Sequence, residues 1–133
     1  MMYEGKIKVK KTNENGRKKV VTEHYIINGV YLFAEAEYKL MELCNGECEV
    51  THLTKSSIRE IVNMKEEGFP FFKASIVATF THDDGSEKDL AYPVLVCAED
   101  IEQANILIQE YMKQGLEDMR LKEIKETKIL DVL

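Results

Sequence analysis

Apolar and polar residues alternate along two stretches of the chain that begin about half its length apart. Alternation with a period of two is typical of β-strands that bury one face. Each stretch is interrupted by a turn with Asn15-Gly16 or Asp84-Gly85, and such pairs favour tight turns between antiparallel strands. The pattern therefore predicts two β-hairpins, over residues 3–12 with 19–28 and over 72–80 with 89–97.

A helical pattern follows each predicted hairpin. Apolar residues recur at the three- and four-residue spacing of one helix face. They are Phe33, Ala36, Leu40 and Leu43 in the first half, and Ile101, Ala104, Ile108 and Tyr111 in the second. Asp100 can cap the second helix, with Gln103 completing a capping box. Leu32 holds the corresponding place in the first half, so that helix start is expected either to be looser or to be fixed by packing of Tyr31 and Phe33.

The two halves correspond to each other along their whole length. The hairpins align with an offset of 69 positions (72 minus 3), the helices with 68 (101 minus 33) and two short final strands with 71 (129 minus 58). Such self-similarity indicates an internal duplication. We therefore predict an α+β fold of two pseudo-symmetric strand-strand-helix-strand repeats, with mostly antiparallel sheet and the helices on one face.

The length of the chain fits one domain over residues 1–133, with repeat 1 at about 1–66 and repeat 2 at about 69–133. The composition, 44% hydrophobic and 32% charged, is that of a soluble globular protein without a membrane span. The N-terminal residues 1–11 lack the apolar stretch of a secretory signal. Three cysteines, an odd number, suit a reducing compartment, so a cytoplasmic location is expected.

Charge is distributed unevenly along the chain. Residues 1–19 hold seven basic and two acidic residues, a balance of +5, whereas residues 20–133 hold 11 basic and 22 acidic residues, a balance of −11. A basic strip on an acidic protein can bind phosphates while the remaining surface repels nonspecific contacts. The predicted anion-binding residues are Lys6, Lys8, Lys10, Arg17, Lys18 and Lys19. Tyr3 and Tyr25 are predicted to stack on unpaired bases.

A second interpretation of these lysines is structural. Lys6, Lys8 and Lys10 alternate with Ile7 and Val9, the arrangement that protects an unpaired strand edge from aggregation. Charged clusters are also common on surfaces that bind nothing. Both interpretations remain open from the sequence.

Cys44, Cys48 and His52 form a Cys-x3-Cys-x3-His run, which is a candidate metal site. Zinc normally has four ligands, and nothing in the sequence brings Cys97, His24, His82 or a carboxylate close to supply the fourth. We therefore predict no metal and assign the cysteines as packed or partly exposed thiols.

The sequence shows no catalytic signature. The three histidines do not converge, and the nucleophile, phosphate-loop and dinucleotide motifs are all missing. The prediction is a non-enzymatic protein without a cofactor.

Several segments resemble a known family: Tyr3-Glu4-Gly5-Lys6-Ile7, residues 10–16, residues 18–23, Glu35-Ala36-Glu37 and Ile129-Leu130-Asp131-Val132. The family consists of uncharacterised small domains of gut bacteria and their bacteriophages, including crAss-like phages. The resemblance covers nearly the whole chain and lends no active site. It implies a phage or mobile-element setting, in the host cytoplasm, where small non-enzymatic proteins often serve replication or counter host defences.

Three functions follow as hypotheses. The first is a phage accessory protein whose basic N-terminal hairpin binds nucleic acid, single-stranded in particular. The second is a protein-interaction module or inhibitor that acts on a host or replication protein, or a homodimer, through a free strand edge or an acidic helix face. The third is sequestration of a small nucleotide in a pocket between the repeats or between subunits.

Overall fold

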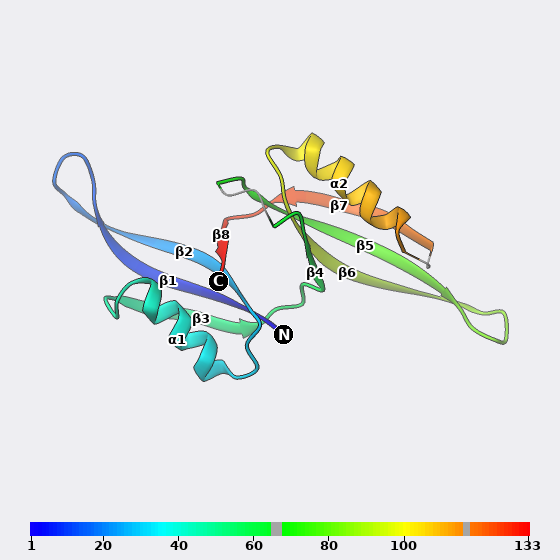
Figure 1. The fold of residues 1–133 in the computed structure, drawn as a ribbon, viewed down its shortest axis with the longest axis horizontal. Helices are drawn as coiled ribbons and strands as arrows, with labels where there is room; N and C mark the ends of the chain where they lie inside the picture. Colours follow the sequence, from blue (N-terminus) through cyan, green and yellow to red (C-terminus); the bar gives the residue numbers. More distant parts are fainter. Residues whose placement is uncertain (65–67, 116–117) are drawn as a thin grey trace. The chain divides into compact units, whose positions relative to one another are not determined.

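A computed structural model describes residues 1–64, 68–115 and 118–133 of the protein. In these residues two sheets are present, each with a helix across it (Figure 1). The elements are β1 (Met2–Thr12), β2 (Lys18–Asn28), α1 (Phe33–Leu43), β3 (Cys48–Lys55), β4 (Glu60–Val62), β5 (Phe71–Thr81), β6 (Glu87–Cys97), α2 (Ile101–Lys113), β7 (Asp118–Glu126) and β8 (Ile129–Val132). The predicted α+β class is confirmed.

The strand orders are β3-β1-β2-β8 in one sheet and β4-β6-β5-β7 in the other. Most neighbours are antiparallel, as predicted, whereas β8 on β2 and β4 on β6 are parallel. The chain divides into two compact units. The first unit comprises Met1–Ser56 with Lys128–Leu133, and the second comprises Ser57–Thr127. Each sheet therefore receives its last strand from the other copy. The repeat boundary predicted near residue 66 lies outside the described residues.

The strand registers follow the predicted duplication. Val9 lies opposite Val21 in the first hairpin, and Ala78 lies opposite Leu90 in the second, which preserves the offset of 69. Even the bulges correspond, since the register shifts between Lys6 and Ile7 in one sheet and between Ser75 and Ile76 in the other. The duplication thus extends to backbone irregularities.

Each copy contains one strand more than predicted. These strands, β3 and β7, follow the helices and lie at sheet edges. Their side chains are exposed or half-buried throughout, so the apolar alternation that reveals a strand is weak. The bulge in each pairing also shifts the period by one residue. His52 therefore lies on a strand, β3, that the sequence pattern did not predict.

Each helix packs its predicted central residues into a core. Ala36 and Leu40 of α1, and Ala104 and Ile108 of α2, are fully buried. The first core also contains Tyr3, Ile7, Tyr25 and Ile27, and the second contains Phe72, Ile76, Val94 and Val96. The buried stripe is narrower than predicted, because Phe33, Leu43 and Ile101 at the helix ends are about half exposed.

The helix starts differ as the sequence indicates. The Asp100 carboxylate accepts a hydrogen bond from the Gln103 backbone N–H at 2.8 Å. The Gln103 side chain accepts from the Glu99 N–H, one residue before the cap, at 2.6 Å. Leu32 makes no side-chain cap at the start of α1. There Phe33 packs edge-on against Tyr3, with ring centroids 4.9 Å apart, so core packing fixes the helix start.

The uncapped start predicts that Leu32→Ser stabilises the protein. Leu32 already has the extended backbone of a cap residue (φ −123°, ψ 147°), and Glu35 stands three residues on, as a capping box requires. A serine hydroxyl at this position can accept from the Glu35 N–H, which is worth about 1 kcal/mol. The measurement is the free energy of unfolding in urea. Leu32→Ala is the control, and equal stability of the two variants would contradict the predicted cap.

Candidate nucleic-acid interface

The six predicted anion-binding residues are all exposed and all lie on the first hairpin. β1 carries Lys6, Lys8 and Lys10, the turn carries Arg17, and β2 begins with Lys18 and Lys19. The structure therefore places all six predicted residues on the first hairpin, which belongs to the first unit.

β1 is an interior strand of its sheet. It pairs with β2 along its whole length and with β3 from Tyr3 to Val9. Lys6 and Lys8 thus have strands on both sides, and edge protection is the wrong interpretation for them. Only Lys10 and the residues after it extend beyond the pairing with β3. The row of lysines consequently needs another explanation.

Four of the cations share one face of the sheet. Tyr3 and Ile7 point into the core beneath α1, so Lys6, Lys8 and Lys10, in the alternate phase, lie on the opposite face. Lys18 joins them, because its partner across the hairpin is Thr12, which has the same phase. We call Lys6, Lys8, Lys10 and Lys18 the lysine face. Successive lysines on β1 are about 6.8 Å apart, two strand residues. Lys19, opposite Lys11, lies on the helix side.

Beside the lysine face, His24 and Glu4 form a cross-strand pair. His24 Nε2 lies 3.0 Å from Glu4 Oε1. Burial lowers the pKa of His24 below its ordinary value of 6.5, and Lys6 and His52 act in the same direction, while Glu4 opposes the shift. The imidazole is therefore neutral at neutral pH and contributes no positive charge there.

A groove of about 1160 Å³ runs in the first unit between the hairpin and the loop that joins α1 to β3. Its basic lining residues are Lys8, Lys10, Lys11 and Lys18, and its acidic ones are Glu23, Glu47 and Glu49. Glu23 is only 9% exposed, and Lys11 donates to it at 2.9 Å. Burial, assisted by the Glu23 carboxylate, raises the pKa of Tyr25 to about 12. Lys11 thus neutralises a buried carboxylate, whereas the lysine face has no such role.

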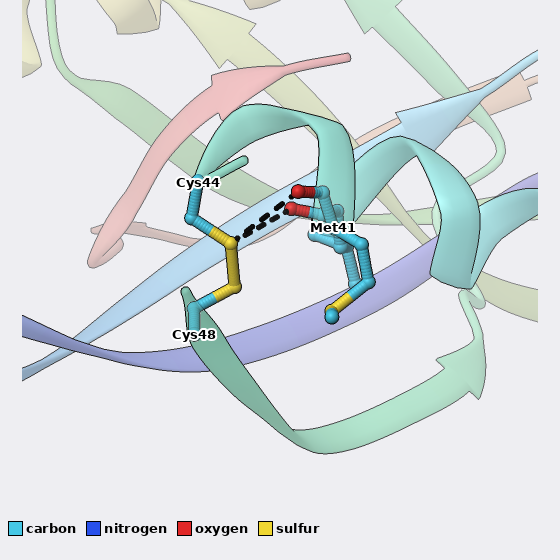
Figure 2. The surroundings of a disulfide bond; sticks show 4 residues. Met41, Cys44 and Cys48 are labelled. Atoms are coloured by element: carbon cyan, nitrogen blue, oxygen red, sulfur yellow. Dashed lines mark hydrogen bonds between the residues drawn. A yellow bond between two sulfur atoms is a disulfide. The ribbon is translucent and has the colours of Figure 1, made fainter. Parts of the chain in front are cut away.

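A disulfide closes the loop at one end of this groove. Cys44 and Cys48 are bonded to each other, with Cα atoms 5.9 Å apart, so their assignment as thiols is wrong (Figure 2). Cys44 Sγ lies 3.7 Å from the Leu40 carbonyl oxygen and 3.5 Å from that of Met41. A disulfide sulfur has no hydrogen to donate, so these are packing contacts. Sequence spacing alone does not reveal the pairing.

Backbone hydrogen bonds fix the same loop. Asn45, with φ 52°, donates to the Glu42 carbonyl, and Gly46, with φ 79°, donates to that of Met41. This pair of bonds is a Schellman motif, which ends a helix with left-handed residues. With the disulfide it holds the groove wall in one conformation. Among the described residues no His, Cys, Asp and Glu cluster could hold a metal ion.

The stacking prediction is wrong for both tyrosines. Tyr3 is 1% exposed and donates through its hydroxyl to the Tyr31 carbonyl at 3.0 Å. Tyr25 is 7% exposed. Both rings lie in phase with core residues, so neither presents a face to a base. The exposed aromatic residues of this unit are Tyr31, Phe33 and Tyr38, at 74%, 48% and 65%.

The second hairpin lacks the lysine face. With the offset of 69, Lys6, Lys8 and Lys10 correspond to Ser75, Val77 and Thr79, and Lys18 corresponds to Glu87. Only Lys19 has a basic counterpart, Lys88. Since both hairpins share one backbone pattern, the fold does not require these lysines.

Comparison with known proteins identifies a family but no characterised relative. No curated protein and no solved structure is significantly similar to the chain. In the part of the chain that the structure describes, no helix has the length and apolar character to cross a membrane. One family profile, described as a domain of unknown function (DUF4494), matches residues 1–133. The match spans the whole sequence, so the chain belongs to the DUF4494 family.

Proposed function

We propose that this protein is a non-enzymatic accessory protein of a phage or mobile element that binds single-stranded nucleic acid through its first hairpin. The observation that carries the proposal is the lysine face: four exposed lysines share one side of a hairpin, and none is among the ion pairs found in the described residues. Edge protection does not explain Lys6 and Lys8, which have strands on both sides, and the second hairpin forms the same pairing without lysines at the corresponding positions. Unpaired cations in a row are the usual means of contacting phosphates.

The arrangement suits an extended single strand. Lys6, Lys8 and Lys10 follow one β-strand, and Lys18 lies opposite the end of that strand, so an extended sugar-phosphate chain can lie along the lysine face. A duplex presents a wider anionic surface. The rest of the protein, with a balance of −11 over residues 20–133, would repel such a surface.

Salt dependence tests this proposal. Each phosphate contact with a single strand contributes about −0.7 to the slope of log K against log salt concentration. If the four lysines of the face each contact a phosphate, the slope is therefore about −3. Affinity for a fluorescent 20-nucleotide single strand should then fall about 50-fold between 50 and 200 mM salt. A duplex of the same sequence should bind more weakly. Binding that does not respond to salt, or that favours the duplex, would count against the proposal.

A second candidate function is a protein-interaction module acting on a host or replication protein. One observation favours it: apolar side chains are exposed around the start of α1, namely Tyr31, Leu32, Phe33 and Tyr38, at 48% to 74%. A shallow depression lies beside them, lined by Val30, Ala34, Glu35, Tyr38, Lys39 and Glu42. Exposed apolar patches often mark protein contacts. A complex that survives nuclease treatment in a pull-down, and is lost in Tyr38→Glu, would support this alternative.

A further inference from the structure

The second unit contains a pocket of about 280 Å³ that corresponds, through the repeat, to the groove of the first unit. Phe80 and Tyr92 line it at the positions that Lys11 and Glu23 hold in the first unit, 69 residues earlier. Met119 lies at the position of Cys48, 71 residues earlier. One copy thus has an ion pair and a disulfide where the other has apolar and aromatic side chains.

Interactions among its own residues hold the walls of this pocket. The Arg59 guanidinium lies over the Tyr92 ring, 4.5 Å from its centroid. The Tyr92 hydroxyl donates to Met119 Sδ at 3.6 Å. The Tyr111 hydroxyl donates to Glu60 Oε2 at 2.7 Å. The side chain of Arg59 and side chains from β4, β6, α2 and β7 therefore hold one another in place without a ligand.

The pocket combines apolar, aromatic and guanidinium surfaces with two polar groups, the Glu60 carboxylate and the Gln114 amide. Aromatic rings and Arg planes stack on unpaired nucleobases, and polar side chains read the exposed edges of such bases. Burial and the Glu60 carboxylate raise the pKa of Tyr111 above its ordinary value, so its hydroxyl stays a donor. Glu60 has a second oxygen, Oε1, for which the described residues show no hydrogen bond. An ionised carboxylate only accepts, so it selects bases that present N–H donors.

The volume and the charge of the pocket limit the class of ligand further. The volume of about 280 Å³ is just below the roughly 300–1,000 Å³ typical of small-molecule sites, so the pocket suits a single ring system. Arg59 and Glu60 balance each other, so the pocket does not favour a simple cation or anion. Guanine offers adjacent ring N–H and amino donors that match the two oxygens of a carboxylate. Uracil and thymine present mainly carbonyl acceptors on the same edge.

We propose that this pocket binds one unstacked nucleobase that carries an amino group, guanine in preference, with its ring against Arg59 and the aromatic wall and its donors on Glu60. The base can belong to a free nucleotide or to a bound single strand. The inference does not depend on the lysine face, because a nucleoside without phosphate is sufficient to fill the site.

The test is a titration of the whole protein with guanosine, adenosine, cytidine and uridine in turn. NMR shifts of the Tyr92 and Tyr111 ring resonances report the binding of each nucleoside. Guanosine should bind most tightly and uridine least. Glu60→Gln should weaken guanosine binding about 10- to 100-fold, as expected for the loss of hydrogen bonds to a charged group. Its amide oxygen can still accept from Tyr111, so the fold should persist. Asp131→Asn, at the corresponding position of β8, is the matched control and should change nothing.

Two results would overturn the proposal: no shift of either tyrosine ring with any nucleoside, or guanosine binding that Glu60→Gln leaves unchanged. Tyr111→Phe serves as a second variant, since it removes only the hydroxyl that orients Glu60 and should also weaken guanosine binding. Oligonucleotides with and without guanine separate the two sources of the base. Tighter binding of oligonucleotides that contain guanine would show that the pocket takes a base of a bound strand. Binding of free guanosine without such a preference would show that the pocket takes a soluble nucleotide. Because nucleosides lack phosphate, this result would stand even if the lysine face did not bind nucleic acid.

Discussion

The variant Lys6→Glu, Lys8→Glu, Lys10→Glu is expected to bind a single-stranded oligonucleotide about 100-fold more weakly than the wild type at 50 mM salt. The loss corresponds to about 1 kcal/mol for each phosphate contact, before the added repulsion is counted. The three side chains are exposed on one strand and take part in none of the ion pairs of the described residues, so their exchange should leave the fold intact. Fluorescence anisotropy measures the binding, and circular dichroism checks the fold.

A matched control separates position from net charge. Lys88→Glu, Lys122→Glu, Lys125→Glu changes the charge by the same amount on exposed residues of the second unit. This control should keep most of the affinity, because the contacts on the lysine face remain. Equal weakening in both triple variants would show that overall charge, and not the lysine face, governs binding.

Removal of residues 128–133 is expected to destabilise the first unit, although these residues belong to the second copy in sequence. β8 is a strand of the first sheet, Ile129 is 6% exposed, and Leu133 packs against the first core. The Leu133 N–H also donates to the Ile26 carbonyl at 2.7 Å. Loss of two apolar side chains costs about 3 to 5 kcal/mol, a large part of the stability of a small domain.

Amide hydrogen exchange measures this effect in each unit separately. Protection should fall in β2, around Ile26 and Ile27, and persist in β5 and β6 of the second unit. Ile129→Ala, which keeps the backbone pairing, should give a smaller loss of about 2 to 4 kcal/mol. Reduced protection in the second unit alone would contradict the strand exchange between copies.

Much of the fold could be predicted because it is encoded in local patterns. The hairpins, the helix faces around Ala36 and Ala104, and the Asp100 cap each depend on residues close in sequence. The exchange of β4 and β8 has no such signal. A short apolar strand has the same alternation whichever sheet it joins, so only tertiary structure decides its partner.

The sequence points to the lysines of the candidate site as a hypothesis and indicates only part of their geometry. Alternation along β1 places Lys6, Lys8 and Lys10 on one face, and the structure agrees. The same alternation puts Tyr3 in phase with Ile7, a signal of burial that argues against stacking. The interior position of β1 could not be foreseen, because it depends on β3, an edge strand with a weak apolar pattern. The aromatic pocket draws residues from five elements of the second unit, which no local spacing reveals.

The most direct test of the central claim compares the salt slopes of oligonucleotide binding for the wild type and for Lys6→Ala, Lys8→Ala, Lys10→Ala. Loss of three phosphate contacts should reduce the magnitude of the slope by about 2, from about 3 to about 1, because each contact contributes about 0.7 in single strands. That change would identify the lysine face as the surface that binds phosphates. Identical slopes for the two proteins, or no binding by the wild type at 50 mM salt, would contradict the proposed function.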